Sequence, residues 1–163
     1  MKDIRPTSGK VLAALFSILG GKIEGAKFLD LFAGTGHVGF EALKRGAGLC
    51  VFVESVRSRA ESIKRLAGDN TVLGLEARRA VSWLVKRGMK FDVIFADPPY
   101  SSGWCDVLPE LKGLAELFAD DGIMIIEHSI REPLKLKDNT NNLEIISQRE
   151  YGETCLTFLQ RMT

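Results

Sequence analysis

The chain has 163 residues, of which 45% are hydrophobic and 26% charged, and its formal net charge is +1 at pH 7. This is the size and composition of one ordinary globular domain, and such a chain can bury a core without disulfides or metals. The apolar runs at 93–96 and 123–126 are far shorter than the roughly 20 residues that cross a membrane, and residues 1–6 have no apolar signal core. We therefore expect a cytoplasmic protein with no membrane segment.

The three cysteines, at positions 50, 105 and 155, argue against a disulfide framework or a zinc site. Their number is odd, their spacing is wide, and no Cys-x-x-Cys pair occurs. Free cysteine is often a core residue, so we expect three packing cysteines in a reducing compartment and no bound metal.

The charges are distributed unevenly, because Lys and Arg predominate over 56–90 and Asp and Glu over 91–128. A basic region can attract phosphate groups, whereas the same pattern also arises from solvated helix faces. The two interpretations differ in whether these arginines share one surface.

Short apolar strands alternate with amphipathic segments along most of the chain. Thr7 or Ser8 can cap a first helix, whose apolar face includes Leu15 and which ends at Gly20. The patterns that follow predict strands at 28–32, 49–53, 72–77, 91–96 and 123–127, helices at 38–45, 56–67, 80–86 and 104–118, and a turn at 120–122.

The pattern changes after Arg131. A polar stretch at 135–142 predicts a loop, and two β-like runs at 143–147 and 154–159 predict an antiparallel hairpin. The alternation before it favours an α/β fold with a mostly parallel sheet covered on both faces, to which the hairpin adds an antiparallel edge. We expect a single domain over 1–163.

A glycine-rich loop follows the first predicted strand. Gly34 and Gly36 let the backbone turn sharply and approach a ligand closely, and ligands of open α/β sheets bind at the carboxyl ends of the strands. Glu54 ends the second strand, where a carboxylate can accept hydrogen bonds from two ribose hydroxyls. The predicted cofactor-binding residues here are Asp30, Phe32, Ala33, Gly34, Thr35, Gly36, Glu54 and Ser55, to which we add Asp97 at the end of the fourth strand.

Two cofactor classes fit this loop. Gly34, Gly36 and Gly39 spell the G-x-G-x-x-G of dinucleotide sites. Asp30 weighs against a dinucleotide, because its charge disfavours a pyrophosphate and suits a cationic ligand such as a sulfonium with an α-amino group. The chain is also short for a dehydrogenase with its own substrate domain. We therefore favour S-adenosylmethionine, with S-adenosylhomocysteine as product; a tight loop without a ligand is the remaining alternative.

The motif Asp97-Pro98-Pro99-Tyr100 follows the fourth predicted strand and so reaches the same sheet edge. Prolines stiffen the turn and lack N–H donors, which leaves acceptors such as the Pro98 carbonyl. An exocyclic base amine is a poor nucleophile, because its lone pair is delocalised into the ring. Asp97 and the Pro98 carbonyl can each accept one amine hydrogen and orient the nitrogen, while Tyr100 stacks on the base. The motif, Pro99 included, predicts methyl transfer to a base amine beside the cofactor.

Together these motifs resemble the bacterial 16S ribosomal RNA guanine-N2 methyltransferases, over residues 5 to about 160. The Arg-Pro-Thr segment is the most family-specific piece, and the other motifs are shared with many methyltransferases. The matching stretches are Arg-Pro-Thr-Ser at 5–8, Ala-Leu-Phe-x-Ile-Leu at 14–19, Leu-Asp-Leu-Phe-Ala-Gly-Thr-Gly at 29–36, Gly-x-Glu-Ala-Leu at 39–43, Phe-Val-Glu at 52–54 and Asp-Pro-Pro-Tyr at 97–100.

The resemblance implies a class I S-adenosylmethionine-dependent, Rossmann-like methyltransferase fold with a seven-stranded sheet. It implies methylation of a guanine N2 amine in 16S ribosomal RNA, free or in the small ribosomal subunit particle, by a monomer. An N-terminal segment and helix at 1–21 would precede a catalytic core at 22–163. Arg5, Thr7 and Tyr100 would contact the RNA substrate.

Two departures from the family pattern are visible. The family usually has a basic N-terminal hairpin before Arg-Pro-Thr, whereas four residues precede Arg5 here, so we expect a truncated chain or a different mode of RNA docking. The family also tends to place an acid after the third strand, near the cofactor adenine. The matching stretch here is 78–80, so we expect a backbone amide of Arg79 or Ala80 to serve instead.

Other polar and aromatic residues have weaker signals. His37 begins a helix, whereas Glu127 and His128 end the fifth strand and can shape the substrate pocket. Trp83 and Trp104 are expected to be packing residues, although Trp104 follows a flexible stretch and can belong to a flap.

Three functional hypotheses remain: a base amino-methyltransferase, a dinucleotide-dependent oxidoreductase, and a binding module that has lost activity. Within the first, the Asp-Pro-Pro-Tyr motif alone does not separate guanine N2 from adenine N6, or RNA from DNA.

Overall fold

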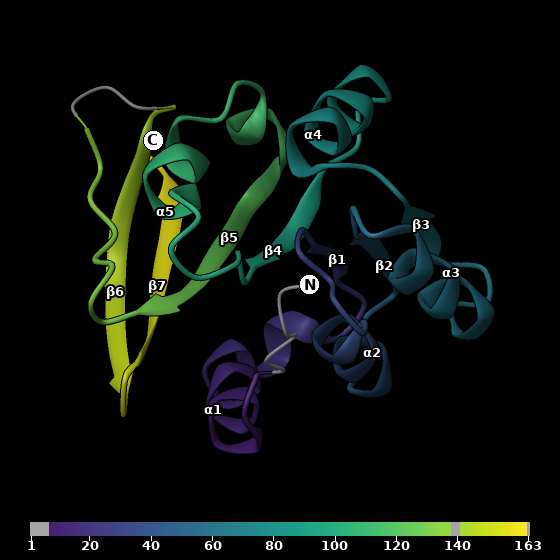
Figure 1. Ribbon diagram of the computed structural model, residues 1–163, viewed down its shortest axis with the longest axis horizontal. Coiled ribbons are helices and arrows are strands. Elements are labelled where there is room, and N and C mark those ends of the chain that lie inside the picture. The colour runs from purple at the N-terminus through teal and green to yellow at the C-terminus, as the bar shows by residue number, and fades with distance from the viewer. Residues whose placement is uncertain (1–6, 138–140, 163) are drawn as a thin grey trace.

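A seven-stranded sheet forms the centre of the protein, as a computed structural model of residues 7–137 and 141–162 shows (Figure 1). The strand order is β3-β2-β1-β4-β5-β7-β6. Neighbouring strands from β3 to β5 are parallel, and β7 is antiparallel to both β5 and β6. The strands are β1 Lys27–Asp30, β2 Leu49–Val53, β3 Thr71–Leu73, β4 Phe91–Ala96, β5 Phe118–Ser129, β6 Leu143–Tyr151 and β7 Thr154–Arg161.

Helices cover both faces of this sheet. One face packs against α1, α2 and α3 and the other against α4, α5 and two 3-10 turns. In Figure 1, α1 and α2 lie toward the bottom and α4 toward the top. The helical segments are α1 Gly9–Leu19, η1 Gly20–Ile23, α2 His37–Lys44, α3 Arg57–Leu66, α4 Ala77–Lys86, α5 Trp104–Val107, η2 Leu108–Glu110 and η3 Leu114–Leu117. The α/β fold class predicted from the alternating pattern is confirmed.

Continuous apolar strands arise because both faces are buried. Along β1, Phe28 packs into the layer beneath α1 and α2, and Leu29 into the layer beneath α4. In β2, Phe52 packs into the layer beneath α1 and α2, and Val51 into the layer beneath α4. The three cysteines are free and buried, as predicted.

The ends of several elements follow local residue chemistry. The Ser8 hydroxyl accepts a hydrogen bond from the Val11 N–H and so caps α1, while Gly20 ends the helix with a φ of 52°. The bounds of β2 and β4 are those predicted from their apolar runs.

Three predicted elements differ from the structure. The helix predicted at 104–118 is broken into α5, η2 and η3, because Pro109 lacks an N–H and Gly113 has a φ of 89°. The turn predicted at 120–122 lies inside β5 as an irregularity where the register to β4 shifts and Asp121 has a φ of 60°. The strand predicted at 72–77 ends at Leu73, and α4 starts at Ala77.

The hairpin is longer than predicted, with β6 running to Tyr151. Among the described residues, no helix has the length and apolar character that a membrane span requires.

Gly39 permits a close approach of α2 to the sheet, which gives a test of the packing. A Cβ at this position would lie 2.3 Å from Phe52 Cε1 and 2.8 Å from Cys50 Sγ, both in buried side chains of β2. We expect Gly39→Ala to lower the free energy of unfolding by about 1–3 kcal/mol, because overpacking displaces the helix from the sheet. Urea denaturation measures the change.

Gly9→Ala is the matched control, since a Cβ there meets nothing within 4 Å. It should leave stability unchanged or raise it by up to about 1 kcal/mol. Equal stability of the two variants would contradict this account of the helix–sheet contact.

Candidate active site

A cavity of about 800 Å³ lies at the carboxyl ends of β1, β2 and β4. The strand order reverses between β1 and β4, which is where open α/β sheets bind ligands. The glycine loop after β1 and the Asp97–Tyr100 turn after β4 both line this cavity. Of the residues predicted to form the site, those in its wall are Thr7, Asp30, Phe32, Ala33, Gly34, Thr35, Glu54, Ser55, Asp97, Pro98, Pro99 and Tyr100.

The glycine loop is held by backbone hydrogen bonds. The Ala33 N–H donates to the Val53 carbonyl at 2.9 Å, and the Gly36 N–H donates to the Ala33 carbonyl at 2.7 Å. Gly34 has a φ of 59° and lines the cavity. Gly36, predicted to bind cofactor, lies outside the cavity wall; its φ of 83° begins α2, and a Cβ there would be 2.6 Å from the Phe40 ring.

Glu54, which follows β2, links the loop after β1 to the segment after β2 through its carboxylate. One carboxylate oxygen accepts the Gly34 N–H and the other the Val56 N–H, each at 2.8 Å. Each oxygen keeps further lone-pair capacity, so the side chain fixes the loop and can still accept ligand hydroxyls.

Asp30 is a buried carboxylate that the fold leaves half satisfied. One oxygen accepts the Gly39 N–H at 3.1 Å, whereas Oδ1 has no hydrogen-bond partner within the described part of the chain. Burial raises the pKa of Asp30 to about 7, against the lowering effect of the Gly39 hydrogen bond and with a further contribution from the charge of Glu54. A group with this environment favours a cationic ligand, because the ligand would replace the missing partner.

The four residues of the Asp97–Tyr100 turn differ in how far they are exposed. Asp97 is half-buried and Pro98 buried, whereas Pro99 and Tyr100 are exposed at the rim. Burial first, and then the Glu127 carboxyl beside it and the charge of Asp30, raise the pKa of Asp97 well above its ordinary value. The turn is anchored to the segment after β5 by Glu132, which accepts the Ser101 N–H at 2.8 Å.

The residues after β3 that line the cavity are not the ones predicted to bind the cofactor there. Arg79 and Ala80 lie outside the cavity wall, and the Ala80 N–H donates to the Glu76 carbonyl within α4. Leu75, Glu76 and Ala77 line the cavity instead. Glu76 is therefore an acid at the position where the resemblance expects one. The sequence analysis missed it by extending the third strand over 74–77, although Gly74 is a strand-ending signal.

Trp104 packs against the core, as predicted, as does Trp83, and Trp104 also forms another wall of the cavity. Its ring meets Phe32 edge to face at 5.2 Å, and the Arg78 guanidinium lies 4.6 Å from the ring centroid. His37 also lines the cavity. His128 does not, because its ring bonds Thr157 Oγ1 and the Ser129 carbonyl. Arg5 lies outside the described residues.

The basic residues of 56–90 are divided between opposite faces of the sheet, because α3 and α4 cover different faces. Arg57, Arg59, Arg78 and Arg79 lie in the first turns of these helices, next to the strand ends that form the cavity, and Arg59 lines it. These four arginines therefore lie near the carboxyl edge of the sheet rather than together on one of its faces.

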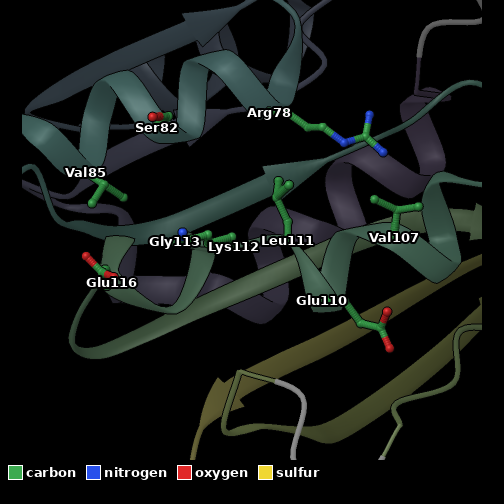
Figure 2. Close-up of a pocket in the computed structure, with 9 residues that line it drawn as sticks. All are labelled: Arg78, Ser82, Val85, Val107, Glu110, Leu111, Lys112, Gly113 and Glu116. Atoms are coloured by element: carbon green, nitrogen blue, oxygen red, sulfur yellow. The ribbon is translucent and has the colours of Figure 1, made fainter.

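A second hollow of about 560 Å³ lies between α4 and the segment 107–116 (Figure 2). Ser82 and Val85 come from α4, and Glu110, Leu111 and Glu116 come from the opposite wall. Its wall contains no residue predicted to act in catalysis or cofactor binding, and no group of three metal-ligating side chains occurs among the described residues.

The strand order and the cavity at its reversal define a class I S-adenosylmethionine-dependent methyltransferase fold. A solved structure described as "Putative methyltransferase yhhF from Escherichia coli" has a TM-score of 0.79 and 28% identity, covering 99% of this chain and 91% of that one. Another, described as "a putative methyltransferase complexed with SAH", has a TM-score of 0.71 at 14% identity and covers 92% of this chain and 48% of that one, which shows the fold alone.

The chain belongs to the family described as "Conserved hypothetical protein 95", which it matches over residues 1–160. It is 34% identical over 157 residues to "Putative rRNA methyltransferase YlbH" of Bacillus subtilis, covering 92% of this chain and 84% of the relative. It is 34% identical over 139 residues to "Ribosomal RNA small subunit methyltransferase D" of Escherichia coli, covering 80% of this chain and 67% of the relative. These matches confirm the family resemblance drawn from the motifs.

The buried carboxylate of Asp30 predicts a pH dependence of stability. Between about pH 4 and pH 7 the unfolded chain loses the Asp30 proton while the folded chain keeps it, so the free energy of unfolding falls as pH rises through this window. A rise of the pKa from 3.8 to about 7 corresponds to at most about 4 kcal/mol. We expect Asp30→Asn to remove this part of the decline.

Urea denaturation at pH 4.5 and pH 7.5 measures the difference between wild type and variant. Asp69→Asn, at an exposed carboxylate after α3, is the control and should keep the wild-type pH dependence. If Asp30→Asn declined as steeply as wild type, Asp30 would be ionised in the fold throughout the window.

Proposed function

We propose that this protein transfers a methyl group from S-adenosylmethionine to the exocyclic N2 amine of a guanine in 16S ribosomal RNA. The observation that carries the proposal is the meeting of two turns in one cavity: Asp30 and the glycine loop at one side, and Asp97–Tyr100 at the other. In this proposal the cationic cofactor and the substrate amine bind in the same cavity.

The residues of the cavity fit S-adenosylmethionine. Asp30 Oδ1, buried and without a partner in the described residues, matches the α-ammonium group of the ligand. Glu54 retains acceptor capacity for ribose hydroxyls, and Glu76 and Leu75 offer a polar and an apolar contact for the adenine. The cavity volume of about 800 Å³ lies within the range of cofactor pockets.

Bound S-adenosylmethionine would supply a methyl group already activated by its sulfonium. The work of the protein is then to position the nucleophile, by hydrogen bonds from the amine to Asp97 and to the Pro98 carbonyl. The amine nitrogen forms its bond to the methyl carbon as the carbon–sulfur bond breaks and its electron pair moves to sulfur. The nitrogen then gives up one proton, which leaves through the Asp97 carboxyl to water.

The RNA assignment rests on the family. The relatives named above are ribosomal RNA methyltransferases, one of them of the small subunit. Tyr100 is 44% exposed at the cavity rim, where a flipped base can stack on it. The arginines in the first turns of α3 and α4 supply positive charge beside the same edge for the RNA backbone. We infer that free 16S RNA or the small-subunit particle docks there, and that the protein acts as a monomer in the cytoplasm.

Two alternatives give different products. An adenine-N6 methyltransferase would use the same Asp97 and Pro98 acceptors, so only the product distinguishes it. A dinucleotide-dependent oxidoreductase is disfavoured, because the Asp30 carboxylate lines the space that a pyrophosphate would enter. A binding module without activity is disfavoured by the placement of Asp97 in the cavity.

The direct test is a methyl-transfer assay with labelled S-adenosylmethionine and under-methylated small-subunit RNA or particles, followed by nucleoside analysis. We expect N2-methylguanosine from wild type. Asp97→Ala should lower the rate by at least about 100-fold, because it removes the positioned acceptor, while the affinity for S-adenosylmethionine stays within about threefold. Glu144→Gln, at an exposed residue of β6, should match wild type.

Unchanged turnover in Asp97→Ala would remove Asp97 from the mechanism, and N6-methyladenosine as product would reassign the substrate. A thermal shift produced by NAD in preference to S-adenosylmethionine would favour the oxidoreductase.

Cofactor binding should depend on pH through Asp30. Because its pKa is about 7, protonation below that pH should weaken the binding of the cationic cofactor by up to about tenfold per pH unit. Calorimetric titration between pH 5.5 and pH 7.5 measures this, and Asp30→Asn should bind weakly with no such slope. A wild-type affinity that is constant over this range would place the ammonium group elsewhere.

A further inference from the structure

Two carboxyl groups lie side by side at the ends of β4 and β5. Ala96 pairs with Ile126 in the parallel register, so Asp97, the first residue after β4, comes beside Glu127, which stays within β5 and pairs with Leu156 of β7. The two carboxyls are in hydrogen-bond contact. Asp97 lines the cavity, whereas Glu127 is 5% exposed and lies behind it, outside the cavity wall.

Thr7 holds Glu127 from the other side. Its hydroxyl donates a hydrogen bond of 2.6 Å to Glu127 Oε2 across 120 residues of sequence, and its own side chain is buried. The position of Thr7 is fixed in turn by Ser8, which caps α1. Thr7 and the start of α1 are thereby tied to β5 near its end.

A hydrogen bond between two carboxyls requires one proton between them, since a carboxylate only accepts. Burial raises the pKa of both groups, and the hydrogen bonds from Thr7 and Asp97 favour the charge on Glu127. The pair therefore keeps one proton and one negative charge at neutral pH. The other titratable groups facing Asp97 are Asp30 on β1 and Cys105 on α5, whose pKa burial raises to about 11.

We propose that Glu127, fixed by Thr7, is a positioning residue for methyl transfer: it holds one oxygen of Asp97 through a shared proton and so turns the other oxygen toward the substrate amine. The inference rests on the proposed function and adds a role for the segment before α1. Without the proton, the two carboxylates would repel and Asp97 would lose its orientation. Without Thr7, Glu127 would lose its own anchor.

Variants at Glu127 separate positioning from general structure. Glu127→Ala should lower kcat by at least about tenfold and leave the affinity for S-adenosylmethionine within about twofold, because Glu127 does not line the cavity. Glu127→Gln provides a permanent N–H donor to Asp97, so it should keep kcat within a few-fold of wild type at pH 7.5. We expect wild-type kcat to fall at alkaline pH as the shared proton is lost, and Glu127→Gln should lack this fall.

Variants at Thr7 test the anchor. Thr7→Val should lower kcat, because the side chain keeps its shape but loses the hydroxyl donor, and Thr7→Ser should restore it. Comparing the pH dependence of kcat between wild type and Glu127→Gln isolates the Asp97–Glu127 pair. Asp30 is already ionised above pH 8, and Cys105 and Tyr100 are present in both proteins, so none of these groups can cause a difference between the two profiles.

The decisive measurements are kcat and cofactor affinity for these four variants on small-subunit RNA, with kcat followed from pH 7 to pH 10 for wild type and Glu127→Gln. Wild-type rates in Glu127→Ala, an alkaline fall in Glu127→Gln equal to that of wild type, or a Thr7→Ser variant as slow as Thr7→Val would each overturn the proposal. If Glu127→Ala fails to fold, the Gln and Ser variants decide. A wild-type protein without transfer to a guanine amine would instead refute the proposed function itself.

Discussion

The parallel pairing of β1 with β4 is the constraint on which the site depends. Each strand ends in a turn to which the proposed function gives one ligand: the cofactor at the glycine loop after Asp30, and the substrate amine at the Pro-Pro turn after Ala96. Because the strands are neighbours and the order reverses between them, no helix separates the two turns at the carboxyl edge. The cavity follows from this arrangement, and the apolar layers on the two faces of the sheet hold it in place.

This edge concentrates groups that an apolar core would otherwise exclude. Asp30, Asp97 and Glu127 are carboxyls within one small region, and burial raises the pKa of all three. Such groups reduce the stability of the fold, because ionised carboxylates are poorly solvated there. The proposed function accounts for their placement: a cation would satisfy Asp30, and a base amine would satisfy Asp97. The protein thus gives up stability at the positions where it needs charge and acceptor oxygens.

Most of the fold could be predicted from the sequence, because apolar periodicity is a strong signal for elements buried on one or both faces. The bounds of β2 and β4 and the cap of α1 were predictable for this reason. The segment 104–118 was not, since its apolar residues suit a helix while Pro109 and Gly113 interrupt it. The meeting of the glycine loop and the Asp-Pro-Pro-Tyr turn in one cavity was also predictable, since both follow parallel strands.

Contacts that depend on the exact end of an element or on distant residues could not be predicted. Glu76 was missed because the third strand was extended by four residues, and Gly36, predicted to bind cofactor, lies outside the cavity wall at the start of α2. The hydrogen bond from Thr7 to Glu127 joins residues 120 positions apart in the sequence, and only the sheet register brings Asp97 beside Glu127.

The central claim is that the cofactor's sulfur and the substrate's amine meet between the glycine loop and the Asp97–Tyr100 turn. A crystal structure of the protein with S-adenosylhomocysteine tests it most directly. The account predicts the ligand in the cavity of β1, β2 and β4, its ammonium group on Asp30 Oδ1 and its sulfur facing Asp97. A ligand bound instead in the hollow between α4 and the segment 107–116, or with its sulfur turned away from Asp97, would contradict it.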